Sequence, residues 1–170
     1  MKGSAVILLG AALLSILAMP IAVTYAAPMQ KVTGGGIAVK SFPPYTFTAI
    51  FGFNVIQDKT SALKGHLDFS YVNLHEGTEF TNTYDSTSVT SLSVTGNTAT
   101  FTGTAKFYSN NPGVEEFNGQ IFKFEVTVTD GGEPGTQDTF FAAIYLLPAE
   151  ILFEQFGTTS LTGGNIQVSI

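Results

Sequence analysis

Apolar residues recur at every second position in four segments of this chain, and this period constrains the fold more than any other feature. The segments are Phe47 to Val55, Leu63 to Tyr71, Ala99 to Phe107 and Phe122 to Val128. Lys64, His66 and Asp68 alternate with apolar neighbours in the second segment, and threonines do so in the third. Successive side chains of a β-strand point to opposite faces, so each segment is predicted to be a strand with one face packed inward.

Turn signals separate these strands from weaker candidates. Gly96-Asn97 is typical of a two-residue hairpin that joins a strand at Val89 to Val94 to the strand from Thr98. The weaker candidates are Gly36 to Lys40, Thr78 to Tyr84, Thr139 to Leu147, Glu150 to Phe156 and Asn165 to Ile170, with a loop from Gly157 to Gly164. Only Leu146 to Gln155 is acceptable as a short helix. About 8–10 short strands predict an all-β chain folded as a single antiparallel β-sandwich.

The interior is expected to be aromatic, because the fifteen phenylalanines follow the two-residue period. Gly34-Gly35-Gly36 precedes a strand and lacks the Lys and helix of a phosphate-binding loop. These glycines are therefore expected to allow a bulge or a close approach of strands at a sheet edge.

The N-terminus is typical of an export signal. Lys2 is followed by an apolar run from Ala5 to Met19, then by Pro20 and small residues that favour cleavage after Ala26. The alternative is an uncleaved membrane anchor, since apolar character continues through Val23. The prediction is a signal peptide over 1–26 and one domain over 27–170, secreted or held at the cell surface.

The net charge of the chain limits the classes of partner that it can bind. The formal charge of −6 becomes −7 without Lys2, and such an acidic chain disfavours nucleic acid and anionic membrane surfaces. Membrane contact is expected only through the signal or anchor segment.

There is no Cys, so stability has to come from packing, sheet hydrogen bonds or a bound ion rather than from disulfides.

An acidic turn with several glycines is the first candidate site. Asp130, Glu133 and Asp138 could supply carboxylate oxygens to Ca²⁺, and the intervening glycines would let main-chain carbonyls turn inward. The spacing does not match an EF-hand. The alternative is a plain turn in which these acids accept hydrogen bonds from backbone N–H groups.

A second candidate metal site involves both histidines of the chain. His66 and Asp68 share the outward face of one strand, and His75 follows in what the sequence suggests is the next loop. If that loop folds back, His66, Asp68 and His75 could bind Zn²⁺ or Cu²⁺. The alternative is that these are solvated side chains.

No catalytic motif stands out. The chain has neither Gly-X-Ser-X-Gly nor His-Glu-X-X-His, and its serines cluster on a polar strand face. Glu115 or Glu116 with Glu125 could form the carboxylate pair of a glycoside hydrolase, but adjacent acids in an Asn/Pro/Gly-rich loop are typical of solvated surface. The prediction is therefore a protein that is not an enzyme.

Five motifs follow one another along the chain: Val32 to Ile37, Phe51 to Val55, Leu63 to Leu67, Val126 to Phe140 and Gly163 to Val168. In this order they resemble the motifs of the post-COAP family, a β-rich module of secreted and surface proteins of prokaryotes. The resemblance spans nearly all of the chain after the signal. It implies a surface module, and it implies no catalytic residues.

Three functions remain open. The leading expectation is a non-enzymatic secreted or cell-surface module with a structural or adhesive role, stabilised by calcium if the acidic turn binds it. The second is a subunit of an extracellular filament or matrix that inserts residues 27–39 as a strand into a neighbour. The third is a carbohydrate-binding module, in which sugar stacking would depend on Tyr45, Tyr84 and Tyr108 because the chain has no Trp.

Overall fold

The computed structural model describes residues 29–170, and every long element in that range is a β-strand, which confirms the all-β prediction. The strands are β1 (Gln30–Phe42), β2 (Tyr45–Gln57), β3 (Leu63–His75), β4 (Thr78–Thr95), β5 (Thr98–Ser109), β6 (Ile121–Thr129), β7 (Thr139–Leu146) and β8 (Ile151–Ser169). A short 3₁₀ helix, η1 (Glu115–Phe117), precedes β6.

The signal segment predicted over 1–26, with its membrane-anchor alternative, lies outside the described residues. Within 29–170, no helix is long and apolar enough to cross a membrane.

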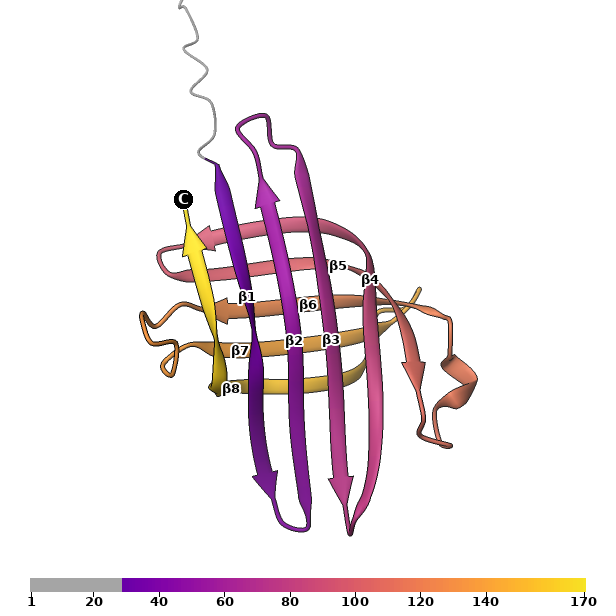
Figure 1. Ribbon diagram of the computed structural model, residues 1–170. Coiled ribbons are helices and arrows are strands. Elements are labelled where there is room, and N and C mark those ends of the chain that lie inside the picture. The colour runs from indigo at the N-terminus through magenta and orange to yellow at the C-terminus, as the bar shows by residue number, and fades with distance from the viewer. Residues whose placement is uncertain (1–28) are drawn as a thin grey trace, which may run out of the picture.

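The eight strands form a closed antiparallel barrel, so the β-sandwich prediction is wrong. Each strand pairs with the next along the chain, and β1 pairs with β8 to close the ring. Figure 1 shows the barrel flattened into two layers whose strands cross, with β1 to β3 in front and β5 to β7 behind. The two layers resemble a sandwich, but β4 and β8 bend from one layer into the other and join them.

Both bent strands change partners along their length. β4 pairs with β3 up to Asp85 and with β5 as far as Thr95, and β8 pairs with β7 up to Ser160 and then with β1 from Leu161. Register shifts between Ser86 and Ser88 and between Val89 and Ser91 mark β-bulges in β4, and bulges bend a strand. The sequence interpretation divided each of these strands in two, because the Ser/Thr-rich and Gly-rich bends have the composition of loops.

The short helix considered for Leu146 to Gln155 is also absent. β7 ends at Leu146, a turn follows, and β8 begins at Ile151, which lies opposite Leu146. Pairing with β7 therefore decides the conformation of this apolar segment, whatever its local preference.

The glycines near the N-terminus allow β1 and β8 to approach closely, as predicted. A Cβ placed on Gly36 would lie 2.6 Å from the carbonyl oxygen of Gly163, and one on Gly34 would lie 2.7 Å from the Phe53 ring. The expected sheet edge does not exist here, because β1 has a partner strand on each side.

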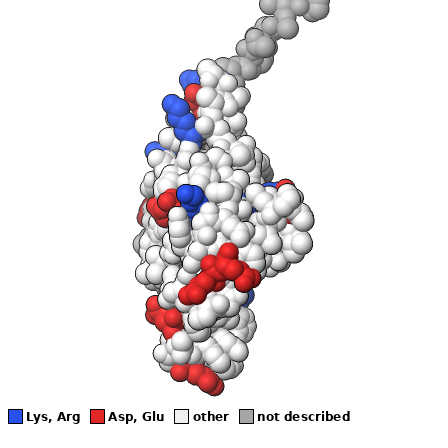
Figure 2. Space-filling view, turned by 90° about the vertical axis from the view of Figure 1, so that its right-hand side faces the viewer, with Lys and Arg blue, Asp and Glu red and all other residues white. Residues whose placement is uncertain are grey.

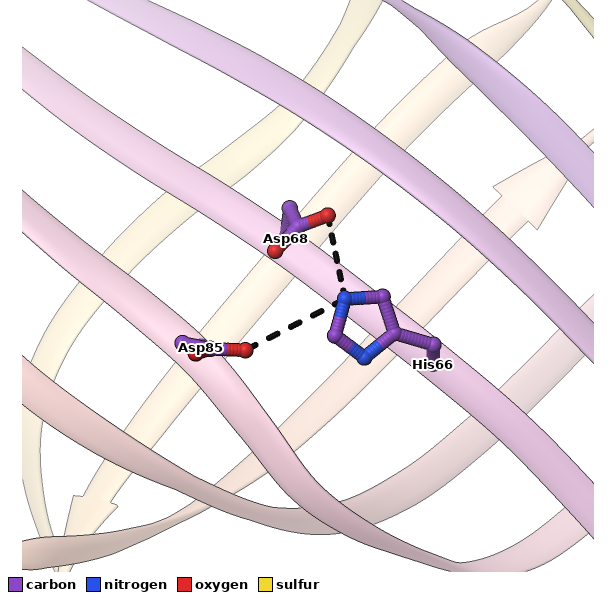
Figure 3. Close-up of side chains that lie close together, drawn as sticks. All are labelled: His66, Asp68 and Asp85. Atoms are coloured by element: carbon purple, nitrogen blue, oxygen red, sulfur yellow. Dashed lines mark ion pairs between the residues drawn. The ribbon is translucent and has the colours of Figure 1, made fainter.

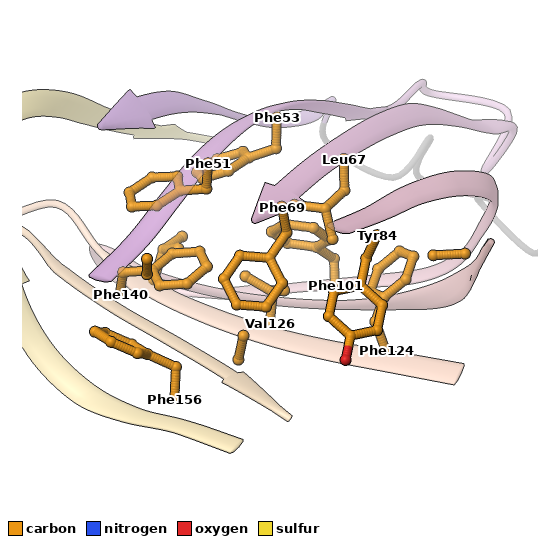
Figure 4. Close-up of a cluster of buried hydrophobic side chains, with 14 of the residues drawn as sticks. Phe51, Phe53, Leu67, Phe69, Tyr84, Phe101, Phe124, Val126, Phe140 and Phe156 are labelled. Carbon is orange, nitrogen blue, oxygen red and sulfur yellow. The ribbon is translucent and has the colours of Figure 1, made fainter. Parts of the chain in front are cut away.

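The interior is filled by aromatic side chains from both layers, which confirms the predicted role of phenylalanine (Figure 4). Phe51 of the front layer stacks on Phe140 of the back layer, with ring centroids 3.9 Å apart. The fully buried rings are Phe69, Tyr84, Phe101, Phe107, Phe122, Phe124 and Phe140. Burying a side chain of this size stabilises the fold by about 1.5–3 kcal/mol, so these rings provide much of the stability that disulfides cannot.

Among residues 29–170, the change of partners leaves two strand edges without a neighbouring strand. β3 has β4 beside it only from Asp68 onward, and β8 has β7 beside it only up to Ser160. At the first edge the backbone N–H of Leu67 donates to Ser86 Oγ at 2.8 Å. At the second edge, the loop between β6 and β7 supplies the acceptors.

Candidate functional site

The acidic turn between β6 and β7 lies along the open edge of β8. Asp138 is fully buried, and its two oxygens accept the backbone N–H groups of Gly131 at 2.8 Å and Ile166 at 2.6 Å. Asp130 accepts those of Gly132 at 2.9 Å and Val168 at 3.1 Å. Two aspartates thus satisfy β8 backbone groups that no strand reaches, as buried N–H groups require.

These contacts confirm the hydrogen-bonding alternative for the acidic turn. Glu133 takes part as well, because its Oε1 accepts the side-chain amide of Asn165 at 3.0 Å. A calcium ion here would have to share oxygens that already accept N–H donors, and Ca²⁺ takes about 6–8 oxygen ligands. Calcium binding by Asp130, Glu133 and Asp138 stays a prediction of the sequence.

Within residues 29–170, the side chains close enough to share one metal ion are His66, Asp68 and Asp85, whose ligand atoms lie within 4.8 Å of one another. His66 Nε2 lies 3.0 Å from Asp68 Oδ2 and 3.9 Å from Asp85 Oδ1 (Figure 3). All three residues are exposed on the outer face of β3 and β4. The structure therefore brings together His66 and Asp68 as predicted.

His75 does not join them. It is the last residue of β3 and stacks on Tyr45, with ring centroids 4.3 Å apart. A strand rises ~3.3 Å per residue, so His75 lies roughly 30 Å from His66. The loop on which the prediction depended is part of a strand.

Asp85 takes the place expected of His75, and sequence reasoning missed it. The sequence feature that could have placed Asp85 is the two-residue turn at Glu76-Gly77, in which φ is positive at both residues, 48° and 80°. A two-residue turn there pairs His75 with Thr78, and counting back along both strands places Asp68 opposite Asp85.

His66 also belongs to a hydrogen-bonded row with Ser86, whose Oγ lies 2.9 Å from His66 Nδ1. The order Ser86, His66, Asp68 is that of a Ser–His–carboxylate triad. Ser86 Oγ, however, already accepts the Leu67 N–H, which ties it to the open edge of β3. The row thus has a structural role that accounts for Ser86.

A carboxyl group enters the barrel at Glu154 of β8. Tyr84 donates its hydroxyl to Glu154 Oε2 at 2.5 Å, and Asn82 donates its amide to Oε1 at 2.8 Å. Burial raises the pKa of Glu154 to about 7, although both hydrogen bonds act in the opposite direction. Sequence reasoning did not single out this group, because it lies in a segment for which both a weak strand, Glu150 to Phe156, and a short helix were considered.

The outer sides of the first five strands carry two cross-strand rows without charge. In one row, Ile37, Ile50, Ser70, Thr83 and Tyr108 lie opposite one another across β1 to β5. In the next row, Val39, Thr48, Val72 and Thr81 do so across β1 to β4. These nine residues are called the uncharged outer face; β1 to β3 present it toward the viewer in Figure 1.

A hollow of about 350 Å³ lies at the β5 end of this face, lined by Thr81, Thr83, Tyr108, Ser109, Asn110 and Asn118. The three tyrosines considered for sugar stacking differ in their exposure and in their distance from this hollow. Tyr108 is 47% exposed in the hollow, Tyr45 is 40% exposed at the start of β2, and Tyr84 is buried.

Figure 2, which views the barrel from the β4 side, shows charged side chains in separate groups with uncharged surface between them.

The acids considered for glycoside hydrolysis stand on separate elements. Glu115 and Glu116 lie exposed in η1, and Glu125 lies on the outer side of β6. None of them lines the hollow.

Comparisons with models of protein families, with curated proteins and with solved structures found no match to this chain. The resemblance to the post-COAP family therefore stays a prediction from the quoted motifs.

Because Asp138 accepts two buried hydrogen bonds, we expect its substitution to destabilise the protein even when no metal ion is present. In EDTA, Asp138→Asn should lower the free energy of urea unfolding by about 2–4 kcal/mol. The asparagine has only one acceptor oxygen, so one of the two backbone N–H groups would face an amide N–H and lose its hydrogen bond. Glu133→Gln is the matched control, since it can still accept from Asn165, and it should change stability by less than about 1 kcal/mol. Equal stability of Asp138→Asn and the wild type would contradict the edge-covering role.

Calcium binding has a separate readout in the thermal midpoint. If the turn binds Ca²⁺, millimolar Ca²⁺ should raise the midpoint of the wild type over EDTA by several degrees, and Asp130→Asn should abolish the rise. Equal midpoints in the two buffers would remove the calcium prediction.

The raised pKa of Glu154 predicts a loss of stability as pH rises. From its ordinary value of 4.5 to the folded value of about 7, the folded state holds a proton that the unfolded state has released. Stability should therefore fall over this window by roughly 2–3 kcal/mol and then level off. Glu154→Gln should lack that component in urea unfolding at pH 5 and pH 8, while Glu79→Gln, an exposed carboxylate, should keep it. An identical pH dependence for wild type and Glu154→Gln would contradict the assignment.

Proposed function

We propose that this chain is a non-enzymatic module of the extracellular space or cell surface, with an adhesive role carried by the uncharged outer face. The observation that carries the proposal is the register of β1 to β5, which aligns two rows of uncharged side chains on a strongly acidic protein. The export signal and the resemblance to a family of surface modules support the location.

The interior of the barrel is closed and filled, so we expect ligands to bind at the outer surface. Aromatic rings from both layers occupy the barrel, and Phe51 stacks on both Phe53 and Phe140. A barrel of this size has room either for its own side chains or for one small ligand. Since the side chains fill it, recognition is expected at the outer surface.

The outer face has the composition of a contact surface. Ile37 and Ile50 lie opposite each other and are 43% and 46% exposed. Exposed apolar side chains grouped in one place favour an interaction surface, whereas single ones need no explanation. Thr48, Ser70 and Thr83 add hydroxyl groups around them. The face can therefore contact partners through both apolar and hydrogen-bonding groups.

Hydroxyl pairs continue over the outer side of the other strands. Thr100 and Thr127 lie 2.9 Å apart across β5 and β6, and Ser91 and Thr102 lie 2.6 Å apart across β4 and β5. Such cross-strand pairs stabilise a sheet by roughly 0.2–1 kcal/mol each. They support a structural role for the outer side of β4 to β6 around these pairs, and they leave the contact surface on the nine residues of the uncharged outer face.

Filament assembly by strand addition has less support. β1 contains most of the segment proposed to insert into a neighbour, and it pairs with β2 and β8 of its own chain. Donation of this strand would require the barrel to open, with the loss of both sets of hydrogen bonds and of the core beneath them.

Surface binding by the purified chain from Ala27 onward tests the proposal. The labelled wild type is expected to bind saturably to whole cells or matrix of its source organism. Ile50→Ser should weaken this binding at least tenfold, because it removes exposed apolar area from the part of the face where Ile37 and Ile50 lie side by side. Ile121→Ser, an exposed isoleucine of β6, is the matched control and should bind as the wild type does.

A parallel assay addresses catalysis. The wild type should show no turnover of ester, peptide or glycosidic substrates. Absence of saturable surface binding, or turnover abolished by Ser86→Ala, would refute the non-enzymatic adhesive role.

A further inference from the structure

The hollow beside Tyr108 is an open depression at one end of the uncharged outer face, and it is rich in amide side chains. Its volume, about 350 Å³, falls at the low end of the range for small-molecule sites, about 300–1,000 Å³. Thr81 and Thr83 belong both to the hollow and to the face. A ligand that fills the hollow can therefore continue along the face.

Tyr108 supplies an accessible aromatic ring at this place. It is nearly half exposed, and within residues 29–170 no other aromatic ring stacks on it. Tyr45 differs, because Phe47 and His75 both stack against it. A free tyrosine ring offers an apolar face beside a hydroxyl group that can hydrogen-bond.

Two asparagines fix the polar side of the hollow. Asn118 holds the backbone of Ser109 from both sides, with Oδ1 accepting its N–H at 2.6 Å and Nδ2 donating to its carbonyl at 3.1 Å. Asn110 Oδ1 accepts the N–H of Thr81 at 2.7 Å. These bonds orient the amides before any ligand arrives, and preorganised groups lose less entropy on binding.

Hydrogen-bonding capacity remains for a ligand after these contacts are made. An amide group has two N–H donors and two acceptor lone pairs, and the Asn110 contact uses only one acceptor position. The hydroxyl groups of Thr81 and Tyr108 stand beside it. The hollow therefore combines donors, acceptors and one free aromatic face.

The side chains of residues 29–170 that line the hollow are all uncharged, and the whole chain carries a net charge of −6. Phosphates and carboxylates find no cation there, and long-range repulsion from the protein opposes them. Neutral sugars present hydroxyl groups that donate and accept, together with an apolar C–H face. Their chemistry matches what the hollow offers.

We propose that the hollow binds one residue of a neutral polysaccharide, with Tyr108 stacking on the sugar ring and Asn110 hydrogen-bonding its hydroxyl groups. The uncharged outer face carries the following sugar units. The row from Tyr108 to Ile37 crosses five strands, a length of roughly 19 Å, which accommodates several units. This inference rests on the proposed adhesive function and names its ligand class.

Affinity electrophoresis of the chain from Ala27 onward in native gels tests the site. The gels contain soluble glucan, mannan, galactan or xylan, and a gel without polysaccharide is the reference. At least one polymer should retard the wild type. Tyr108→Ala should reduce the apparent affinity at least tenfold, Tyr108→Phe should keep most of it, and Tyr45→Ala, the matched exposed tyrosine, should leave it unchanged.

A second variant separates binding from folding. Asn110→Asp keeps an acceptor for the Thr81 N–H but removes the amide donors, so it should fold with a wild-type thermal midpoint and lose retardation at least tenfold. Lack of retardation of the wild type by every polymer would overturn the inference, and so would an equal loss in Tyr45→Ala and Tyr108→Ala. If cell-surface binding persists in that case, the adhesive function stands without the sugar site. If surface binding also fails, both proposals fall.

Discussion

The structure depends on β4 and β8, each of which pairs with one strand near its start and with another toward its end. This exchange of partners converts two crossed layers into one closed ring of hydrogen bonds. Closure around one filled interior also sets the register of every strand, because a shift by one residue would turn each inward phenylalanine outward. The filled interior and the uncharged outer face therefore follow from the same constraint.

A strand that leaves its neighbour exposes backbone groups, and side chains satisfy them here. Asp138 and Asp130 accept N–H groups of β8, and Ser86 accepts the N–H of Leu67 in β3. In the sequence, acids among glycines resemble a metal loop, and a serine close to His66 and Asp68 resembles a catalytic row. Both groups stand where the barrel needs acceptors, which gives them a structural reason independent of any ligand.

Local patterns predicted the strands but could not predict how they connect. The inward faces of β2, β3, β5 and β6, the phenylalanine core and the hairpin at Gly96-Asn97 are confirmed. The sandwich was wrong because bulges near Ser86 and the bend through Gly157 to Gly164 have loop-like composition, while their backbone continues as strand. Closure is a long-range property, and no local period distinguishes a strand that bends from two strands joined by a loop.

The candidate site was predictable only in part, for the same reason. His66 and Asp68 share a strand face, so alternation alone places them together. Asp85 and the rows that end at Tyr108 depend on cross-strand register, which follows from the turns once these are recognised as two-residue hairpins. Glu154 lies in a segment for which the sequence allowed a weak strand or a short helix, and its approach to Tyr84 depends on long-range pairing of that strand with β7.

Amide hydrogen exchange along β1 tests the closure most directly. Successive N–H groups of a strand point to opposite edges, and β1 pairs with β2 and β8 over residues 31–38. A closed barrel predicts slow exchange at every one of these residues, measured by NMR on the chain from Ala27 onward. Slow exchange at alternate residues only, with fast exchange between them, would mean that β1 has an open edge and would contradict the account.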